Sequence, residues 1–382
     1  MVLQDYKDEM IFCCKCGGCR IGSESALGMP ICPTGERFQY DSYYAAGRFE
    51  NALALLNGQL EWSDKLIDRY FTCQRCGACQ EHCYEELALH PLKVIEEVEK
   101  ELVKRGIGPH PKQHYTHHTR FFEQYGERLK KAAAEEMEKN AELMFFIGCT
   151  LECYEKETFN MTDKILQSAG VNYIASKRDW CCGYPLLHTG QIEQAKGIVE
   201  DNVNVIESLG VKKVVFNCPH CYEIFKYEYP EILGKKPNFE IAHTAEYFLD
   251  LIKDESLKPK IPVKMTVTYH DPCLIGRRGG RIYNPPREIL RSIPGIKLVE
   301  MDRRMGEAWC CGAGARVRIA YPDFAIWTAT QRLQEVESMG VNTLVSACPI
   351  CKFNFSDAIK AKGKNIKIFD LNQLLAESLG LK

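Results

Sequence analysis

Two sets of five cysteines recur in this chain with matched spacing, and each set could hold a metal cluster. In each set a lone cysteine precedes Trp-Cys-Cys-Gly and then Cys-Pro-X-Cys. The two inner gaps are 31 and 35 residues in one set and 36 and 36 in the other, which indicates an internal duplication. We call them the first quintet, Cys149, Cys181, Cys182, Cys218 and Cys221, and the second quintet, Cys273, Cys310, Cys311, Cys348 and Cys351.

Five thiolates are more than a structural zinc ion or a simple cubane cluster requires. Adjacent cysteines in a strand would point to opposite faces, so each Cys-Cys pair can reach one site only from a turn. The glycines that follow, Gly183 and Gly312, permit such a turn, and one thiolate of the pair could then bridge two irons. Pro219 and Pro349 stiffen the last segments, which we expect at helix starts, where backbone amides favour an anionic cluster.

Eight cysteines nearer the N-terminus have a spacing that is typical of iron–sulfur proteins. A Cys-X-X-Cys-X-X-Cys run lets three thiolates converge on one cubane, and a remote cysteine completes the ligand set. In two-cluster ferredoxins that remote ligand comes from the other motif. On this pattern we expect a first quartet, Cys13, Cys16, Cys19 and Cys83, and a second quartet, Cys73, Cys76, Cys79 and Cys32.

Two departures from the ferredoxin pattern leave open how the quartets share their ligands. Cys32 follows Cys19 after a longer gap than is usual, and Tyr84 replaces the proline that often follows the last ligand. Zinc is the alternative metal, because Cys-X-X-Cys pairs also bind zinc, although triple runs favour iron–sulfur clusters. Cys14 and Cys153 fit none of the four sets.

Helices and strands must bring these cysteines together. Helical periodicity over 41–70 and 92–102 separates the N-terminal motifs, and from residue 143 strands alternate with helices. Such alternation predicts parallel sheets with ligands at the strand ends, where both quintets fall. The expected strands cover 143–148, 213–217, 265–270, 297–301 and 342–346, and the expected helices cover 155–169, 192–209 and 322–339.

The fold class predicted is α/β, with a helical N-terminal domain that resembles a two-cluster ferredoxin domain, followed by two duplicated modules. We expect the helical domain over 1–105, a linker and charged helix over 106–142, the first module over 143–260 and the second over 261–382. The linker carries four histidines, for which an exposed linker is a simpler interpretation than a metal site: His110, His114, His117 and His118.

Composition narrows the classes of partner. Lys and Arg number 49 against 51 Asp and Glu, so net charge implies no nucleic acid, and no apolar run is long enough to span a membrane. The N-terminus lacks an apolar signal region, so we expect a cytoplasmic protein whose cysteines bind metal, with any membrane association made through a partner subunit. The segment 312–315 lacks a dinucleotide fingerprint, so electrons should come from a partner that holds flavin, iron–sulfur clusters or a membrane cytochrome.

Duplicated Cys-Cys-Gly modules behind a ferredoxin-like domain resemble the catalytic iron–sulfur polypeptide of heterodisulfide reductase, in the form that fuses both parts. The resemblance covers nearly all 382 residues. It implies a cubane 4Fe–4S cluster in each quartet and a noncubane 4Fe–4S cluster in each quintet, the noncubane pair facing one another across the substrate. The implied reaction delivers two single electrons that split a disulfide, each sulfur being captured on iron, or runs in reverse. In that family the substrate is the coenzyme M–coenzyme B heterodisulfide of methanogens.

Three residues near the second quintet are candidates for binding an anionic substrate: His270, Arg277 and Arg278. The alternative is that His270 caps a strand and the arginines pair with carboxylates. His220, inside a Cys-Pro-X-Cys segment, is expected to donate to a sulfur.

Two other functions stay open from the sequence. Related two-module proteins carry electrons in benzoyl-CoA reductase systems and in glycolate or lactate oxidising systems, so the chain could be a relay without a disulfide substrate. A zinc-stabilised scaffold is the third interpretation. The sequence leaves the substrate, the direction of electron flow, the partner subunits and the oligomeric state undetermined.

Overall fold

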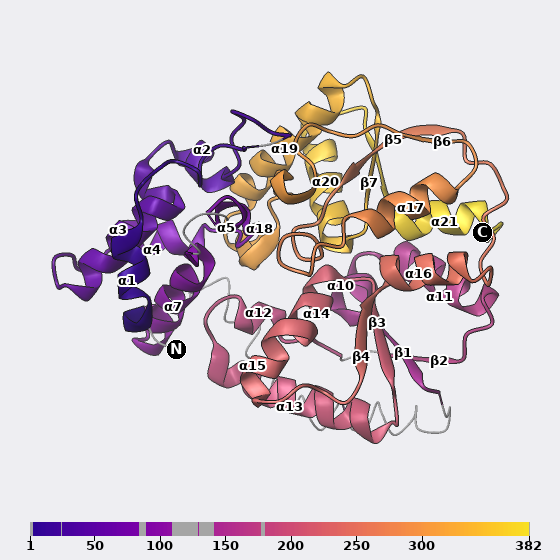
Figure 1. Cartoon of the computed structure of the whole chain (residues 1–382), viewed down its shortest axis with the longest axis horizontal. Coiled ribbons are helices and arrows are strands. Elements are labelled where there is room, and N and C mark those ends of the chain that lie inside the picture. Colours follow the sequence, from indigo (N-terminus) through magenta and orange to yellow (C-terminus); the bar gives the residue numbers. More distant parts are fainter. Residues whose placement is uncertain are drawn as a thin grey trace.

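The computed structural model describes residues 3–23, 25–83, 89–108, 129, 141–176 and 180–381. A region of helices comes first, and two modules follow that each carry a four-stranded parallel sheet. Figure 1 places the helical region at the left and the two modules one above the other at the right. The predicted α/β class with a helical N-terminal region and two duplicated modules is confirmed.

The helical region packs around one apolar core, which includes Phe49, Tyr70 and Val98. The helix expected over 41–70 is interrupted, because the chain turns at Gly58, whose φ is +68, and Ser63 caps a new helix by accepting a hydrogen bond from the Leu66 amide. The elements are η1 (Leu3–Tyr6), α1 (Lys7–Phe12), α2 (Pro33–Phe38), η2 (Asp41–Tyr43), α3 (Ala45–Leu56), α4 (Asp64–Phe71), α5 (Ala78–Glu81) and α7 (Pro91–Lys104).

The first module is a sheet of order β2-β1-β3-β4 with every neighbouring pair parallel. Its central strand β1 is buried along its whole length, as expected of a sheet covered on both faces. Its strands are β1 (Leu143–Phe146), β2 (Tyr173–Ala175), β3 (Lys213–Phe216) and β4 (Glu240–His243). Its helices are α10 (Gly148–Cys153), α11 (Lys156–Ser168), α12 (Tyr184–Leu187), α13 (Ile192–Ser208), α14 (Pro219–Glu223), η5 (Ile224–Glu228), α15 (Tyr229–Leu233) and α16 (Thr244–Lys253).

The second module repeats this topology with the order β6-β5-β7-β8, again parallel throughout. The duplication seen in the cysteines therefore extends to the sheets. Its strands are β5 (Met265–His270), β6 (Ile296–Leu298), β7 (Thr343–Ser346) and β8 (Lys367–Asp370). Its helices are α17 (Asn284–Ser292), η6 (Met305–Glu307), η7 (Gly314–Arg316), α18 (Val317–Ala320), α19 (Pro322–Ser338), α20 (Pro349–Lys362) and α21 (Leu371–Ser378).

The fourth strand of each module, β4 and β8, was not predicted from the sequence. Each has four residues of which only the last is buried, so it carries too little apolar alternation to be recognised. Each ends at a residue whose side chain caps the next helix: His243 accepts from the Ala245 amide and Asp370 from the Asn372 amide.

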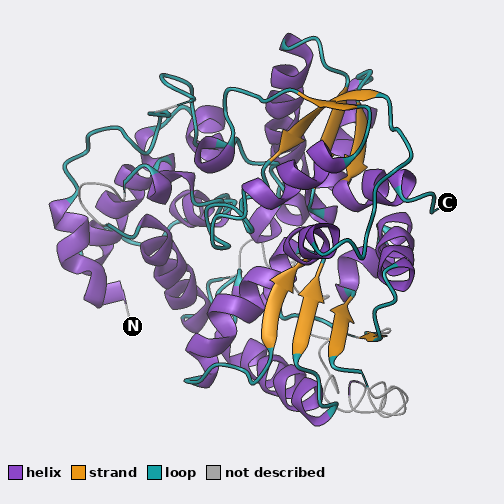
Figure 2. Cartoon of the chain, turned by 45° about the vertical axis from the view of Figure 1, so that its right-hand side comes forward, coloured by secondary structure: helices purple, strands orange, loops and turns teal. Residues whose placement is uncertain are grey.

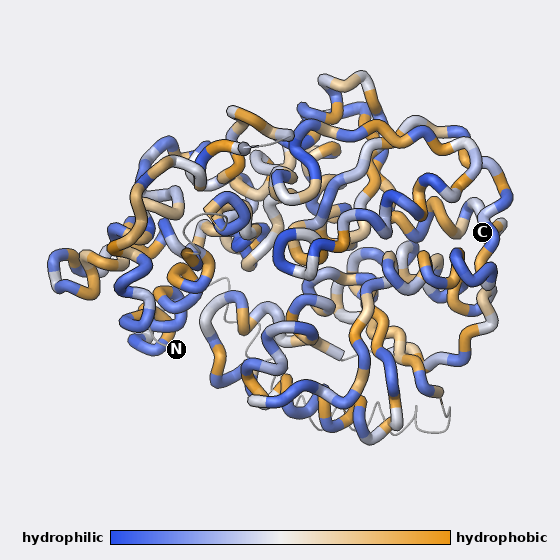
Figure 3. Tube along the Cα trace, viewed as in Figure 1, coloured by the Kyte–Doolittle hydropathy of each residue, from blue (hydrophilic) through white to orange (hydrophobic). Residues whose placement is uncertain are grey.

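The two modules share one hydrophobic core and a polar contact. Helix α21 packs on α11 and α17 packs on α16, so apolar residues of both modules join one cluster. The Asn372 amide donates to Asn217 Oδ1 at 2.6 Å and to Thr162 Oγ1 at 2.9 Å across the boundary. Hydrophobic and hydrophilic positions alternate along the surrounding helices (Figure 3), as expected of helices with one face on a core.

The strands of the first sheet point toward the second module (Figure 2). Residues that follow these strands therefore lie at the boundary between the modules, where open parallel sheets place their ligands. Within the described ranges, no helix combines the length and apolar character that a membrane crossing needs.

Candidate metal centres

The first quintet comes together at the carboxyl ends of three strands. Cys149 follows β1, Cys181 and Cys182 follow β2, and Cys218 and Cys221 open α14 after β3. Their thiols make a continuous series of contacts that runs from Cys149 to Cys181, Cys182, Cys221 and Cys218. All but the half-buried Cys149 are buried. The structure therefore gathers the five cysteines that the sequence grouped.

The second quintet is assembled in the same way from β5, β6 and β7. Its contacts run from Cys273 to Cys310, Cys311, Cys351 and Cys348. The Cys348 sulfur also caps α20 by accepting from the Cys351 amide at 3.4 Å. The twenty cysteines all lie in the described part of the chain, and none is in a disulfide.

Each Cys-Cys pair lies in a turn that its glycine makes possible. Gly183 has φ +79 and Gly312 has φ +95, a region that side chains disfavour. Their amides donate to the first sulfur of each pair, to Cys181 at 3.4 Å and to Cys310 at 3.3 Å. The role predicted for the two glycines is confirmed.

Two asparagines that the sequence did not single out hold these turns. The amide of Asn202, on α13, donates to the Cys181 carbonyl at 2.7 Å, and that of Asn354, on α20, donates to the Cys311 carbonyl at 2.7 Å. Because the two residues come from different helices of the repeat, no shared spacing marks them.

The two quintets approach one another across the module boundary. Burial, together with the nearby Cys218 of the other quintet, raises the pKa of the Cys348 thiol to about 11. Buried thiols of this kind keep their protons unless a cation stabilises the thiolates, and metal ligands must be deprotonated. Ten cysteine sulfurs gathered in two groups, several of them thiols with a raised pKa, therefore fit a soft, cationic metal assembly.

Buried N–H groups beside the quintets also fit an anionic cluster. The indole Nε1 of Trp180, next to Cys181, has no hydrogen-bond partner among the described residues. The same is true of Nε and one terminal nitrogen of Arg332, a buried residue close enough to His270 to act on its charge. Donors of this kind are rarely left unsatisfied in a protein interior, and the sulfurs of a cluster would accept from them.

The N-terminal cysteines gather in two groups, with Cys83 near the first cysteine run and Cys32 near the second. Burial and the neighbouring Cys13, Cys16 and Cys19 raise the pKa of Cys83 to about 11. In the second quartet, burial together with the nearby Cys73 and Cys76 raises the pKa of Cys32 to about 12, although the Arg48 charge opposes the rise.

Arg48 was missed by the sequence analysis. It is 2% exposed and lies close to three thiols of the second quartet, so its charge compensates theirs. Its position in a helix between the two cysteine motifs gave no signal of this role.

The four groups of thiols form a series through the molecule. Cys79 of the second quartet is close enough to Cys19 of the first for the two charges to interact. At the other end, Cys76 contacts Cys310 of the second quintet, and this contact lowers the pKa of the Cys76 thiol. The sequence did not predict this direct contact between a quartet and a quintet.

A cavity of about 330 Å³ lies on the first quintet and is lined by all five of its sulfur-bearing residues. Tyr184 and His220 line it from the first module. The His220 Nδ1 is 3.8 Å from the Cys218 sulfur, so His220 lies next to a sulfur, as the sequence predicted. The Tyr184 hydroxyl accepts a hydrogen bond from the Ala315 amide of the second module at 3.1 Å. The second module lines the cavity with Ala313, Arg316, Arg318, Ile319, Ile350 and Phe353.

The predicted substrate residues His270, Arg277 and Arg278 do not line this cavity. Arg277 donates to the Cys76 carbonyl at 3.0 Å, and Arg278 donates to the Glu223 carboxylate at 2.8 Å. His270 is buried beside the second quintet. Their role in binding substrate stays a prediction.

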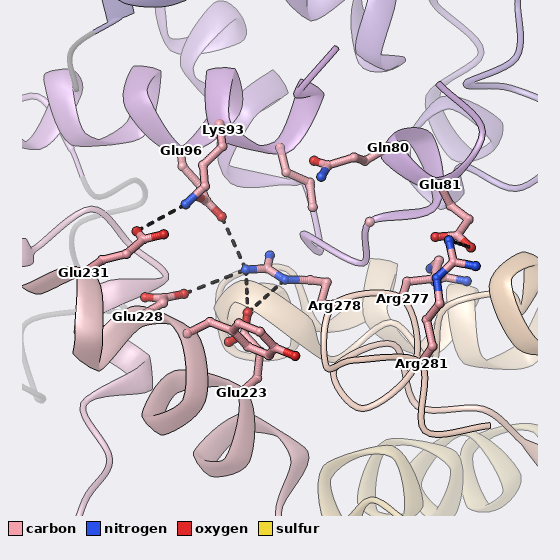
Figure 4. A pocket seen from close by; sticks show the side chains of 13 residues that line it. Gln80, Glu81, Lys93, Glu96, Glu223, Glu228, Glu231, Arg277, Arg278 and Arg281 are labelled. Carbon is pink, nitrogen blue, oxygen red and sulfur yellow. Dashed lines mark hydrogen bonds and ion pairs between the residues drawn. The ribbon is translucent and has the colours of Figure 1, made fainter. Parts of the chain in front are cut away.

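Arg278 belongs to an ionic junction between the helical region and both modules. Figure 4 shows its guanidinium between Glu223 and Glu228 of the first module and Glu96 of α7, at the edge of a second cavity of about 450 Å³. Its positive charge is opposite to the charges of the three carboxylates, so the junction stabilises the contact between the helical region and the two modules. The histidines of the predicted linker and nearly all of its charged helix lie outside the described residues.

Comparisons with known proteins place these features in a family. The CCG cysteine-rich domain family matches residues 143–226 and 267–356. The dihydromethanophenazine:CoB–CoM heterodisulfide reductase of Methanosarcina barkeri has one subunit that is 35% identical over 83% of this chain and 80% of its own length. The corresponding subunit from Methanosarcina acetivorans is 34% identical over 83% and 80%. One subunit of the fumarate reductase (CoM/CoB) of Methanothermobacter marburgensis is 28% identical over 80% of this chain and 60% of its own length.

The matched ranges begin at the first residue of β1 and within β5, and they include every cysteine of both quintets. The chain is therefore an iron–sulfur oxidoreductase subunit that belongs to the CCG cysteine-rich domain family, together with the matched subunits of the heterodisulfide reductases.

Proposed function

We propose that this protein reduces a disulfide, or oxidises the corresponding pair of thiols, at the boundary between its two modules. The observation that carries the proposal is the pairing of two neighbouring cysteine quintets with a cavity that opens onto one of them. Reduction of a disulfide consumes two electrons and two protons and yields two thiols. Two one-electron centres side by side meet that requirement.

The cysteines divide into four ligand sets on this proposal. The first and second quartets would each hold a cubane 4Fe–4S cluster, and the first and second quintets would each hold a noncubane 4Fe–4S cluster, which together supply one-electron transfer. The glycine amides that donate to Cys181 and Cys310 would stabilise the anionic sulfurs there. Arg48 would do the same for the second quartet.

The series of thiol contacts supports an order for electron transfer. The first quartet includes the exposed Cys16, which makes it the accessible end. The contact of Cys76 with Cys310 joins the second quartet to the second quintet, and Cys218 faces Cys348 at the module boundary. Electrons would thus enter at the first quartet from a partner protein that holds flavin, iron–sulfur clusters or a cytochrome.

The cavity suggests the kind of disulfide. Ile319, Ile350 and Phe353 give it an apolar wall, and Arg316 and Arg318 add two cations, the second of which pairs with the Asp357 carboxylate. A disulfide with one apolar arm and one anionic arm would fit this lining. The M. barkeri relative acts, by its name, on the CoB–CoM heterodisulfide, and a substrate of that class is our first candidate.

The second candidate is an electron relay in a larger oxidoreductase, without a disulfide substrate. The proximity of the four thiol groups, each near enough to the next for their charges to interact, supports this function as well, since a relay needs only neighbouring centres.

One experiment separates the two functions. The full chain is purified without oxygen, reduced with a viologen dye and mixed with a disulfide, and oxidation of the dye is followed. Disulfide reduction predicts turnover in the wild type, loss of turnover in Cys182→Ala and unchanged turnover in Cys14→Ala, because Cys14 belongs to no set. Reduced clusters without turnover on any disulfide would leave the relay as the function.

A further inference from the structure

His270 stands at the second quintet where the first module has a residue that cannot bind metal. Both positions are three residues before the lone cysteine of the quintet and end the central strand, β5 in one module and β1 in the other. The first module has Phe146 there, a fully buried ring that packs edge-on against Trp180. The duplicated sites therefore differ in chemistry at one buried position.

The imidazole of His270 is placed among the sulfurs of the second quintet. One ring nitrogen of His270 and the sulfurs of Cys311 and Cys351 all lie within 4.8 Å of one another, and all three residues are buried. Ligand atoms bound to one metal centre have separations of this size.

Two observations separate this arrangement from an ordinary buried histidine. The Nδ1 atom of His270 has no hydrogen-bond partner among the described residues, although the side chain is 1% exposed. Buried polar atoms are rarely left unsatisfied, so the orphaned nitrogen points to an absent partner. The ring is also held in place, since Phe355 packs edge-on against it at 4.9 Å.

We propose that His270 is a nitrogen ligand of the iron–sulfur cluster in the second quintet, beside Cys311 and Cys351. The inference rests on the proposed function, because it requires a cluster at that site. The two clusters are then unequal: the first has five thiolates, and the second has five thiolates and an imidazole.

The inequality has a functional consequence. Because imidazole is neutral, it adds a nitrogen donor to the second cluster and leaves the charge of the thiolate ligands unchanged. The second quintet is also the one that contacts the second quartet through Cys310 and Cys76. The centre that receives electrons is thus the one with the nitrogen ligand, and the first quintet, which lines the cavity, is left to meet the disulfide.

The test is pulsed electron paramagnetic resonance of the full chain, purified without oxygen, with only its histidines labelled with nitrogen-15. A bound imidazole predicts a strong nitrogen coupling in a reduced-cluster signal of the wild type. The coupling should vanish in His270→Gln and persist in two matched controls, His220→Gln, which removes the histidine near Cys218, and Phe146→Leu, which changes the counterpart position. The midpoint potential of the affected cluster should fall in His270→Cys, where a thiolate replaces the imidazole.

Other outcomes overturn the inference in distinguishable ways. A noncubane signal with weak nitrogen coupling alone, unchanged in His270→Gln, would remove the ligand and leave the proposed function standing. Absence of any noncubane signal from the wild type would remove both. Should His270→Gln fail to fold, His270→Cys decides instead, since it removes the imidazole and supplies another ligand: the strong coupling should vanish in His270→Cys and persist in His220→Gln.

Discussion

Comparing Gly183→Ala with Gly312→Ala, the same substitution in the two Cys-Cys-Gly turns, distinguishes the cost of backbone strain from the cost of a steric clash. Both glycines have positive φ, so alanine is strained at either. A Cβ on Gly183 would meet nothing closer than the Ile198 side chain at 3.6 Å. A Cβ on Gly312 would lie 2.6 Å from the Ala325 carbonyl oxygen and 2.9 Å from the Thr328 Cβ. The alanine methyl group therefore has room at this position in the first module and clashes with its neighbours in the second.

The two substitutions should differ in energy accordingly. Left-handed backbone costs a side-chain residue about 1–2 kcal/mol, which is the whole effect expected for Gly183→Ala. Gly312→Ala adds an overpacking cost against fixed backbone, for a total of about 4 kcal/mol. The same Cβ would lie 3.2 Å from Asn354 Nδ2, which donates a hydrogen bond to the Cys311 carbonyl. Any shift of Asn354 away from this Cβ would therefore disturb the second quintet.

Iron content after anaerobic purification, together with urea denaturation, measures both effects. With four tetranuclear clusters, Gly183→Ala should retain about sixteen irons per chain and Gly312→Ala about twelve. The unfolding midpoint in urea should fall further for Gly312→Ala. Equal losses in the two variants, or a greater loss in Gly183→Ala, would refute the reasoning.

Three further predictions follow from single residues. Arg48→Met should lower the midpoint potential of the second-quartet cluster, since a buried positive charge is removed, whereas Lys15→Gln at the exposed surface should not; a redox titration followed by paramagnetic resonance decides. Burial raises the pKa of Asp370 from 3.8 to about 7, so the contribution of its protonated form to stability is complete below pH 4 and is lost as the pH rises through 7. In urea denaturation, Asp370→Asn should therefore gain stability relative to the wild type between pH 4 and pH 7. A constant difference between the two proteins would contradict this. Cys311→Ala should abolish disulfide turnover and leave the quartet clusters reducible by dithionite, while loss of all clusters would indicate that the helical region and the modules fold as one unit.

The quintets could be predicted from the sequence because the same cysteine spacing occurs twice and each cysteine follows a strand. Cys218 and Cys348 mark the ends of β3 and β7 as expected, and the glycines after the Cys-Cys pairs adopt the conformation that their type allows. Such local rules act over a few residues and need no knowledge of the tertiary fold.

Contacts between distant parts of the chain could not be predicted in this way. The meeting of Cys76 with Cys310 depends on how the helical region docks on the second module, and that docking rests on buried ion pairs such as Arg278 with Glu96. Asn202 and Asn354 perform one task from unrelated positions of the repeat, so no pattern links them. The cavity likewise exists only once the two modules meet.

The most direct test of the account is an anomalous difference map at the iron absorption edge from crystals grown without oxygen. The account predicts four iron assemblies, one in each quartet and one in each quintet, with those of the quintets facing one another beside the cavity. Iron in the quartets alone, or cysteines of either quintet joined in disulfides, would contradict it.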